Sequence, residues 1–243
     1  MIYFIGAGPG AVDLITVRGA KILSEAEMII YAGSLVNPEI IKIYAKKNCE
    51  IFDSASMTLE EISQKLLEGH QRNIVTVRLH SGDPALYGAI REQIEFLDEN
   101  NIPFEIIPGV SSLFAASAAL KTEFMIPEIT QSLLISRISG KTPAPDNFAN
   151  FSTVLFLSSA MIETACKKLI QEKYSPETPA ALVYKASWPD EKVLRGTLET
   201  LPALAKEAGI YKTALILVGD FLNKDFHTKS KLYDKNFSHE FRK

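Results

Sequence analysis

Short apolar runs alternate with segments of helical periodicity along the first 110 residues, and three of the runs end in a turn that contains glycine. The runs are rich in Ile, Val and Phe, which is typical of buried strands. Strand, helix and strand at this spacing predict right-handed crossovers and a mostly parallel sheet, so this half is restricted to an open α/β fold. The predicted strands are 2–5, 28–31, 74–79 and 104–107, and the predicted helices are 16–26, 59–66 and 90–97.

The pattern changes after Leu120. Residues 121–130 are irregular and contain a proline, and residues 140–150 hold two further prolines, which is typical of an exposed loop. Two strands in quick succession, 181–184 and 193–197, predict a hairpin and therefore a mixed sheet. The other predicted strands of this half are 133–137, 154–157 and 214–218, and its predicted helices are 162–171 and 200–208.

This change predicts a division into two α/β domains, at 1–122 and 123–243, with a polar tail at 223–243. The chain has 243 residues, of which 47% are hydrophobic, and this is enough apolar material for two compact cores. No basic segment precedes the first apolar run, and the longest uncharged stretch, 147–162, is too short to span a bilayer. We therefore expect neither a secretory leader nor a membrane partner.

The overall charge argues against a nucleic-acid partner. Lys and Arg number 26 against 29 Asp and Glu, so the net charge is −3. An anionic ligand would have to meet basic side chains gathered in one cleft. The two cysteines, Cys49 and Cys166, are too far apart in sequence for a metal or redox motif, and a reducing cytoplasm is the simplest setting. We expect no metal site.

The turn after the first strand, Gly6–Ala11, has the strand-to-helix context of a dinucleotide-binding loop. Two features weaken that interpretation. Pro9 removes a backbone N–H where a phosphate would want a donor, and the second strand has no acidic residue at its end to hold a ribose. A Walker A loop is excluded, because no Lys followed by Ser or Thr comes after the glycines. A purely structural tight turn remains the alternative.

Two further turns follow the strands at 74–79 and 104–107. In the turn 81–88, Asp83 is suited to accept a hydrogen bond from an ammonium or hydroxyl group, or to cap the helix that follows. In the turn 108–112, Ser111 is suited to contact a ligand or to cap its own helix. Because open α/β sheets bind ligands beyond the carboxyl ends of their strands, the three turns together predict a shared site.

These motifs resemble the S-adenosylmethionine-dependent tetrapyrrole (corrin/porphyrin) methyltransferases, and the resemblance covers essentially the whole chain. Within that family the chain is similar to the members that methylate C11 of precorrin-4 or cobalt-precorrin-4. The motifs shared with the whole family are GAGPGAVDLITVRG at 6–19, RLHSGDPALYG at 78–88, IPGVSS at 107–112 and ALILVG at 214–219. The more specific motifs are YAGSLV at 31–36, IPEITQSLLISR at 126–137, VYKASWPDE at 183–191 and KSKLYDKNFSHEFR at 229–242.

The resemblance implies two α/β domains, an N-terminal one with a mostly parallel sheet and a C-terminal one with a mixed sheet. It also implies S-adenosylmethionine bound in the cleft between them, and a homodimer. Most of the implied cofactor contacts are small or apolar residues that act through backbone groups. They are Pro9, Ser81, Gly82, Asp83, Leu86, Ser111, Ser112, Leu157, Ala186 and Ala214.

The chemistry implied is transfer of a methyl group from a sulfonium to a ring carbon, and it demands alignment and exclusion of water. The macrocycle activates its own carbon, so no strong protein base is required; the catalytic candidates are His80, Tyr87 and Lys185. Basic side chains would gather the substrate's carboxylates. The substrate-binding candidates are Tyr31, Ser34, Arg78, Arg91, Arg137, Lys185 and Trp188, and Lys121 and Lys141 are further basic candidates.

Structural roles compete with several of these assignments. His80 is equally suited to pack beneath the turn that follows it, Trp188 to plug a turn before its proline, and most basic residues to lie in solvent. Three other functions also remain open. They are a sibling methylase acting at another position or on another substrate, a nicotinamide oxidoreductase, and a non-catalytic tetrapyrrole carrier. The sequence does not distinguish a cobalt-containing substrate from a metal-free one.

Overall fold

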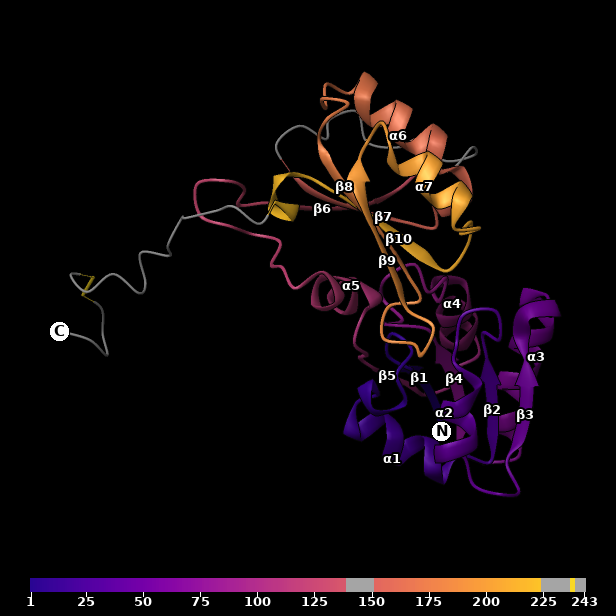
Figure 1. Cartoon of the computed structure of the whole chain (residues 1–243). Helices are drawn as coiled ribbons and strands as arrows, with labels where there is room; N and C mark the ends of the chain where they lie inside the picture. The colour runs from indigo at the N-terminus through magenta and orange to yellow at the C-terminus, as the bar shows by residue number, and fades with distance from the viewer. Residues whose placement is uncertain (139–150, 224–236, 239–243) are drawn as a thin grey trace. The chain divides into compact units, whose positions relative to one another are not determined.

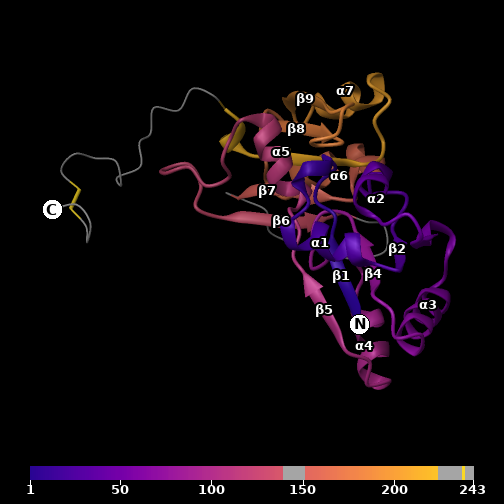
Figure 2. The same ribbon diagram turned by 90° about the horizontal axis from the view of Figure 1, so that it is seen from below.

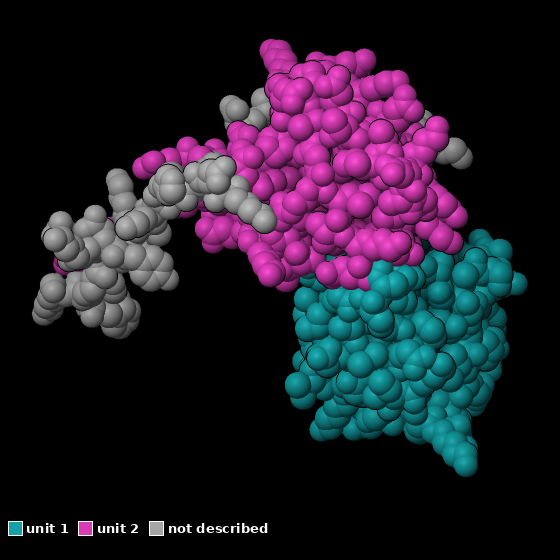
Figure 3. Space-filling view, viewed as in Figure 1, with its two compact units in different colours: residues 1–115, 185–190 teal, residues 116–184, 191–243 magenta. Residues whose placement is uncertain are grey.

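A computed structural model describes residues 1–138, 151–223 and 237–238. The chain forms two compact units, coloured separately in Figure 3. Unit 1 consists of residues 1–115 and 185–190, and unit 2 of residues 116–184 and 191–243. The predicted loop at 140–150 and almost all of the predicted tail lie outside the described residues. No helix in the described part of the chain is long and apolar enough to cross a membrane.

Unit 1 is built on a five-stranded parallel sheet, as predicted. The strand order is β3-β2-β4-β1-β5, which Figure 1 shows along the lower part of the ribbon. The central strand β4 is buried at every position, including its polar residues Thr76, Arg78 and His80. The strands are β1 (Ile2–Gly6), β2 (Met28–Tyr31), β3 (Glu50–Asp53), β4 (Thr76–His80) and β5 (Phe104–Ile107).

Helices cover both faces of this sheet, because neighbouring residues of one strand point to opposite sides. Ile29 packs with Leu23 of α1 and Ile40 of α2, whereas Ile30 packs with Leu66 of α3 and the buried residues of α4. Figure 2 shows these two helical layers on either side of the strands. The helices are α1 (Val17–Glu25), α2 (Pro38–Tyr44), α3 (Leu59–Gln71) and α4 (Arg91–Glu99).

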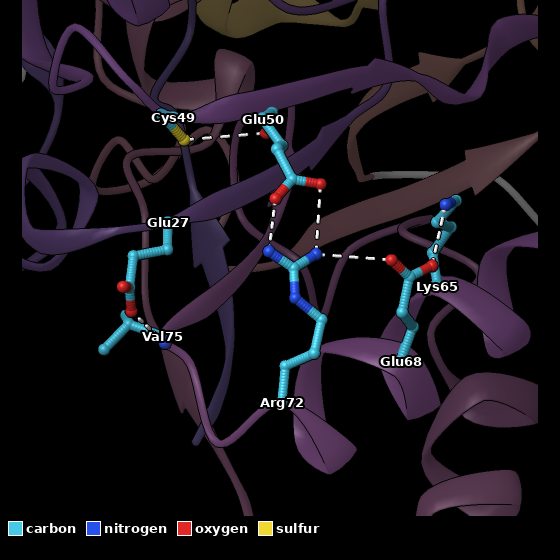
Figure 4. A network of polar contacts seen from close by, with 7 residues as sticks. All are labelled: Glu27, Cys49, Glu50, Lys65, Glu68, Arg72 and Val75. Carbon is cyan, nitrogen blue, oxygen red and sulfur yellow. Dashed lines mark hydrogen bonds and ion pairs between the residues drawn. The ribbon is translucent and has the colours of Figure 1, made fainter.

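Two elements of unit 1, α2 and β3, were not predicted from the sequence. β3 lies at the edge of the sheet, where Ile51 is 49% exposed. Because the strand is only partly buried, its sequence has no continuous apolar run that would predict it. Charged side chains tie it to the following helix. Arg72, at the end of α3, donates to both carboxylate oxygens of Glu50 and to Glu68, as Figure 4 shows. These ion pairs hold the pKa of the Glu50 carboxyl below its usual value.

Unit 2 contains a mixed sheet, also as predicted. The strand order is β6-β7-β10-β8-β9; β6 runs parallel to β7, and the other neighbours are antiparallel. β8 and β9 form the predicted hairpin. The strands are β6 (Leu133–Arg137), β7 (Ser152–Phe156), β8 (Pro179–Tyr184), β9 (Lys192–Thr197) and β10 (Ala214–Val218), and the helices α6 (Ile162–Gln171) and α7 (Leu201–Glu207) pack on the same core.

Candidate functional site

Three glycine-containing loops meet at the carboxyl edge of the parallel sheet. They follow β4, β1 and β5, which are adjacent in the sheet, so the predicted neighbourhood of these turns is confirmed. The backbones of the first two loops pair directly: the Gly82 N–H donates to the Gly8 carbonyl at 2.8 Å, and the Gly8 N–H donates back at 3.3 Å. The loops therefore form one connected backbone surface.

Glycine is required where these loops touch. A Cβ atom on Gly109 would lie 2.1 Å from the Gly82 carbonyl oxygen and 2.7 Å from the Cα of Gly6. A Cβ atom on Gly6 would lie 2.5 Å from the same oxygen. No side chain fits between backbones at this distance. The three glycines therefore set the close approach of the loops: Gly6 and Gly109 have no room for a side chain, and the Gly82 carbonyl lies against both.

Asp83 joins the second loop to the third. Its Oδ2 accepts a hydrogen bond from the Gly109 N–H at 2.8 Å, and its Oδ1 accepts from the Ala85 N–H at 2.8 Å. Asp83 does not cap the following helix, because α4 begins only at Arg91 and has no side-chain cap. The carboxylate thus joins the second loop to the third and orders both around it.

The first loop is held by side chains at three successive residues. The Pro9 carbonyl accepts from the indole N–H of Trp188 at 3.0 Å, and the Gly10 carbonyl accepts from the side-chain amide of Asn37 at 2.8 Å. The Ala11 N–H donates to the Ser187 hydroxyl at 3.0 Å. Sequence reasoning missed Asn37 and Ser187. The only signal was indirect: Ser187 lies within the motif at 183–191, and Asn37 directly follows the motif at 31–36.

The remaining residues predicted in the second and third loops are partly accessible. Tyr87 is 38% exposed and has a left-handed backbone, with φ 58°, a conformation that costs energy for a residue with a side chain. Ser81, Leu86 and Ser112 are half-buried. The hydroxyl of Ser111 accepts from the Leu113 N–H at 3.3 Å, so it caps α5 (Ser112–Leu120), as the structural alternative held.

His80 and Arg78 lie inside the core rather than in an open trough. The Arg78 guanidinium donates to the Gln93 side chain at 3.1 Å and to the Ile30 carbonyl at 3.2 Å. His80 stacks on Phe4, and burial, together with the nearby Arg78 charge, lowers its pKa to about 3. Arg78 was predicted to bind carboxylates of the substrate. Its side chain is only 5% exposed and therefore has no free access to a macrocycle.

The other basic candidates are dispersed over different elements. Arg91 is exposed on α4 and pairs with Glu95, Lys121 follows α5, and Arg137 lies on β6. Lys185 is the candidate that lies next to the loops. Its ammonium contacts Asp190 at 2.6 Å and lies 5.1 Å from the centre of the Trp188 ring. Lys141 lies outside the described residues.

The remaining predicted residues occupy strand ends. Tyr31, which ends β2, is half-buried, and Ser34 is exposed in the turn that follows. In unit 2, Leu157 follows β7 and Ala214 begins β10, and the antiparallel register places both at one end of that sheet. Leu157 is 55% exposed with φ 53°, which is unusual for a large apolar side chain. Ala186, in unit 1, is buried at 6% exposure.

Fold and site together define an α/β protein whose glycine loops form a connected backbone surface beyond the carboxyl ends of a parallel sheet, the place where open α/β sheets bind ligands. Among the residues that the structure describes, no three His, Cys, Asp or Glu side chains gather as a metal-ligand set. The family model of the tetrapyrrole (corrin/porphyrin) methylases matches residues 1–202. The chain belongs to this family.

Individual relatives share almost their full length with the chain. The cobalt-precorrin-4 C(11)-methyltransferase of Methanocaldococcus jannaschii is 51% identical over 100% of this chain and 96% of the relative. The precorrin-4 C(11)-methyltransferase of Mycobacterium tuberculosis is 41% identical over 96% of this chain and 95% of the relative. The crystal structure of a cobalt precorrin-4 methyltransferase superimposes with a TM-score of 0.87 at 41% identity, and the match covers 92% and 96% of the two chains.

Proposed function

We propose that this protein transfers a methyl group from S-adenosylmethionine to C11 of cobalt-precorrin-4 or precorrin-4, in the biosynthesis of the corrin ring of cobalamin. The observation that carries the proposal is full-length similarity, at 51% identity, to a cobalt-precorrin-4 C(11)-methyltransferase. The 41% identity to a precorrin-4 enzyme supports the same position on the ring but leaves both forms of the substrate as candidates. Both relatives are named for methylation at C11.

We place the cofactor on the three glycine loops of unit 1. The loops contribute mainly small residues, so a ligand can approach their backbone N–H and carbonyl groups closely. The proposed contacts there are Pro9, Ser81, Gly82, Asp83, Leu86, Ser111, Ser112 and Ala186. Gly82 fits this role, since a Cβ added to it would be no closer than 3.5 Å to any neighbour, which leaves room beside its left-handed backbone. Leu157 and Ala214 of unit 2 are also proposed as cofactor contacts.

The protein's own contribution to the reaction is positioning. S-adenosylmethionine supplies an electrophilic methyl group with a neutral thioether as the leaving group. The loops have to hold that methyl group in line with the substrate carbon and keep water away from it. The rigid joining of the loops by Asp83 and the three glycines fits this task, because alignment is lost by small displacements. Tyr87, His80 and Lys185 remain catalytic candidates.

Substrate binding is proposed to use the positive charge of Lys185 and the surfaces of Tyr31, Ser34 and Trp188. Lys185 is the strongest of these, because its ammonium lies beside the proposed cofactor loops and its side chain is 25% exposed. A polycarboxylate macrocycle favours such a cation near its rim. Arg91 and Arg137 stay as further proposals for the same role.

The deciding experiment is a methyl-transfer assay with S-adenosylmethionine and each form of the substrate. Purified protein is incubated with precorrin-4 and, separately, with cobalt-precorrin-4. Mass spectrometry then measures the gain of one methyl group, and NMR of the product locates it. Methylation at C11 supports the proposal, methylation at another position identifies a sibling methylase, and macrocycle binding without S-adenosylhomocysteine release identifies a carrier.

Further proposals concern the setting of the enzyme. We infer a cytoplasmic homodimer that has no nucleic-acid partner, with a domain boundary near residue 122. The low cysteine content and the negative net charge support the setting and the absence of a nucleic-acid partner. The resemblance to the family supports the dimer. Light scattering on the purified protein at micromolar concentration tests the oligomeric state directly.

A further inference from the structure

The segment Lys185–Asp190 lies between β8 and β9 along the chain, yet it packs as part of unit 1. Within it, the backbone N–H of Trp188 donates to the Lys185 carbonyl at 2.9 Å and closes a tight turn. Lys185 and Ser187 both have left-handed backbones, with φ 46° and 69°. Residues with side chains adopt this conformation at a cost, and such strain is concentrated at functional sites. Contacts outside the turn must therefore offset the cost of these two backbone conformations.

Two side chains of this turn bind the first glycine loop. The Ser187 hydroxyl accepts from the Ala11 N–H, and the Trp188 indole N–H donates to the Pro9 carbonyl, both at 3.0 Å. The Trp188 ring also occupies the space beside Gly10, where an added Cβ would lie 2.0 Å from the indole. The turn thus fixes the loop on both sides of Gly10.

Asn37, the N-cap residue of α2, binds the backbone group that lies between the two held by the turn. Its Nδ2 donates to the Gly10 carbonyl at 2.8 Å, while its Oδ1 accepts from the Glu39 N–H and caps α2. Asn37 is 8% exposed, so this bond is shielded from water. Three consecutive backbone groups of the loop, at residues 9, 10 and 11, are therefore each bound by a side chain from elsewhere in the sequence.

We propose that Ser187, Trp188 and Asn37 are positioning residues that set the affinity for S-adenosylmethionine by holding the backbone of residues 9–11 in its binding conformation. This inference rests on the proposed function, which places the cofactor on that loop. Holding the loop in advance removes the cost of ordering it when the ligand binds. The affinity for the cofactor therefore falls when a bond of this set is removed. In variants of Ser187 and Asn37, which are not among the proposed substrate contacts, the affinity for the macrocycle changes little.

The test uses three single variants of the full-length protein. Ser187→Ala removes the acceptor of Ala11, and Trp188→Phe keeps an aromatic ring over Gly10 but removes the indole donor. Asn37→Asp keeps the cap of α2, since aspartate is as good a cap as asparagine, but removes the donor to Gly10. Matched controls are Ser24→Ala on the exposed side of α1 and Tyr211→Phe, whose side chain is 63% exposed.

Calorimetry measures the Kd for S-adenosylhomocysteine, and a steady-state assay separates the KM for S-adenosylmethionine from kcat. Loss of one neutral hydrogen bond predicts a rise in Kd of roughly three- to tenfold in Ser187→Ala and Trp188→Phe and no change in the controls. Asn37→Asp should raise Kd at least as much, because it also sets a carboxylate against the Gly10 carbonyl. Since both bonds of the turn hold one loop conformation, the double variant of Ser187 and Trp188 should lose less than the sum of the two single effects.

Each outcome bears on one proposal. If the unaltered protein binds no S-adenosylhomocysteine, the proposed function fails. If it binds and all three variants bind equally well, the positioning role is overturned. In Ser187→Ala and Asn37→Asp, a rise in Kd for the macrocycle as large as the rise for the cofactor also overturns it. Trp188, as the only tryptophan, gives a second readout: its emission should shift when cofactor binds to the unaltered protein.

Discussion

The Oδ2 atom of Asp83 accepts a hydrogen bond from the backbone N–H of Gly109 at 2.8 Å and thereby joins the loop after β4 to the loop after β5. The other carboxylate oxygen accepts from Ala85 within its own loop. Replacing Asp83 by Ala leaves both N–H groups without these partners. Hydrogen bonds to a charged group contribute about 1.5–3 kcal/mol each, so we expect Asp83→Ala to weaken S-adenosylmethionine binding about tenfold or more.

Calorimetry on folded Asp83→Ala checks this expectation, and Asp98→Ala, an exposed aspartate on α4, is the control. Asp83→Asn retains one acceptor oxygen and should show an intermediate loss. If Asp83→Ala binds the cofactor as tightly as the unaltered protein, Asp83 neither contacts the cofactor nor orders its site. If Asp83→Asn matches Asp83→Ala, both oxygens or the negative charge are needed.

The close approach of Gly109 to Gly82 predicts a large effect of adding one methyl group. In Gly109→Ala the new Cβ would lie 2.1 Å from the Gly82 carbonyl oxygen, which is part of the backbone and has little freedom to move away. Overpacking of this kind costs about 1–3 kcal/mol or more. We expect a lower free energy of unfolding in urea and loss of cofactor binding.

Gly209→Ala separates crowding from backbone strain. Gly209 has φ 67°, but no atom lies within 4 Å of a Cβ placed there. This variant should lose only about 1–2 kcal/mol, the cost of a left-handed residue, and should bind cofactor normally. Equal destabilisation in both variants would show that the contact among the loops carries no particular constraint.

The burial of His80 predicts a pH dependence of stability. Its pKa is lowered to about 3 in the folded protein, from about 6.5 in the unfolded chain. Between these values the unfolded chain binds a proton that the folded protein does not, so stability falls as the pH drops below 6.5 and the loss levels off near pH 3. The contribution at pH 4 is up to about 3 kcal/mol.

His80→Leu removes this titration and keeps an apolar contact with Phe4. Urea unfolding from pH 8 to pH 4 should show a smaller loss of stability in the variant than in the unaltered protein. Above pH 7.5 the difference between the two proteins should be constant, which serves as the internal control. Parallel curves over the whole range would mean that His80 becomes protonated in the folded protein near its ordinary pKa.

Much of the fold follows from the sequence, because periodicity reports burial. The strands β1 and β2 are apolar runs, β4 and β5 combine apolar residues with polar ones such as Arg78 and Glu105, and the helices around them carry apolar residues on one face. The edge strand β3 and the short helix α2 escaped prediction for the same reason. Glu50 and Asp53 flank only two apolar residues, Ile51 and Phe52, and the strand is held by the ion pair of Glu50 with Arg72, which is distant in sequence.

The site was harder to predict, because its order comes from contacts that spacing does not reveal. Adjacent parallel strands allowed the three glycine loops to be placed together. Nothing in the sequence connects Ser187 with Ala11, 176 residues away, or tells that Asn37 serves the loop as well as its helix. Arg78 shows the reverse error. A positive charge beside a motif suggested substrate binding, whereas the structure buries it against Gln93.

Lys185 is the basic candidate beside the proposed cofactor loops, and its removal should affect the substrate rather than the cofactor. We expect Lys185→Met to raise the KM for the polycarboxylate macrocycle about two- to fivefold, as for other solvent-accessible ion pairs, and to leave the Kd for S-adenosylhomocysteine unchanged. The effect should shrink as salt is added, because salt screens exposed charges. Lys167→Met, on α6 and paired with Glu163, controls for the change in net charge. An unchanged KM at low salt, or an equal rise in the control, would remove Lys185 from the substrate site.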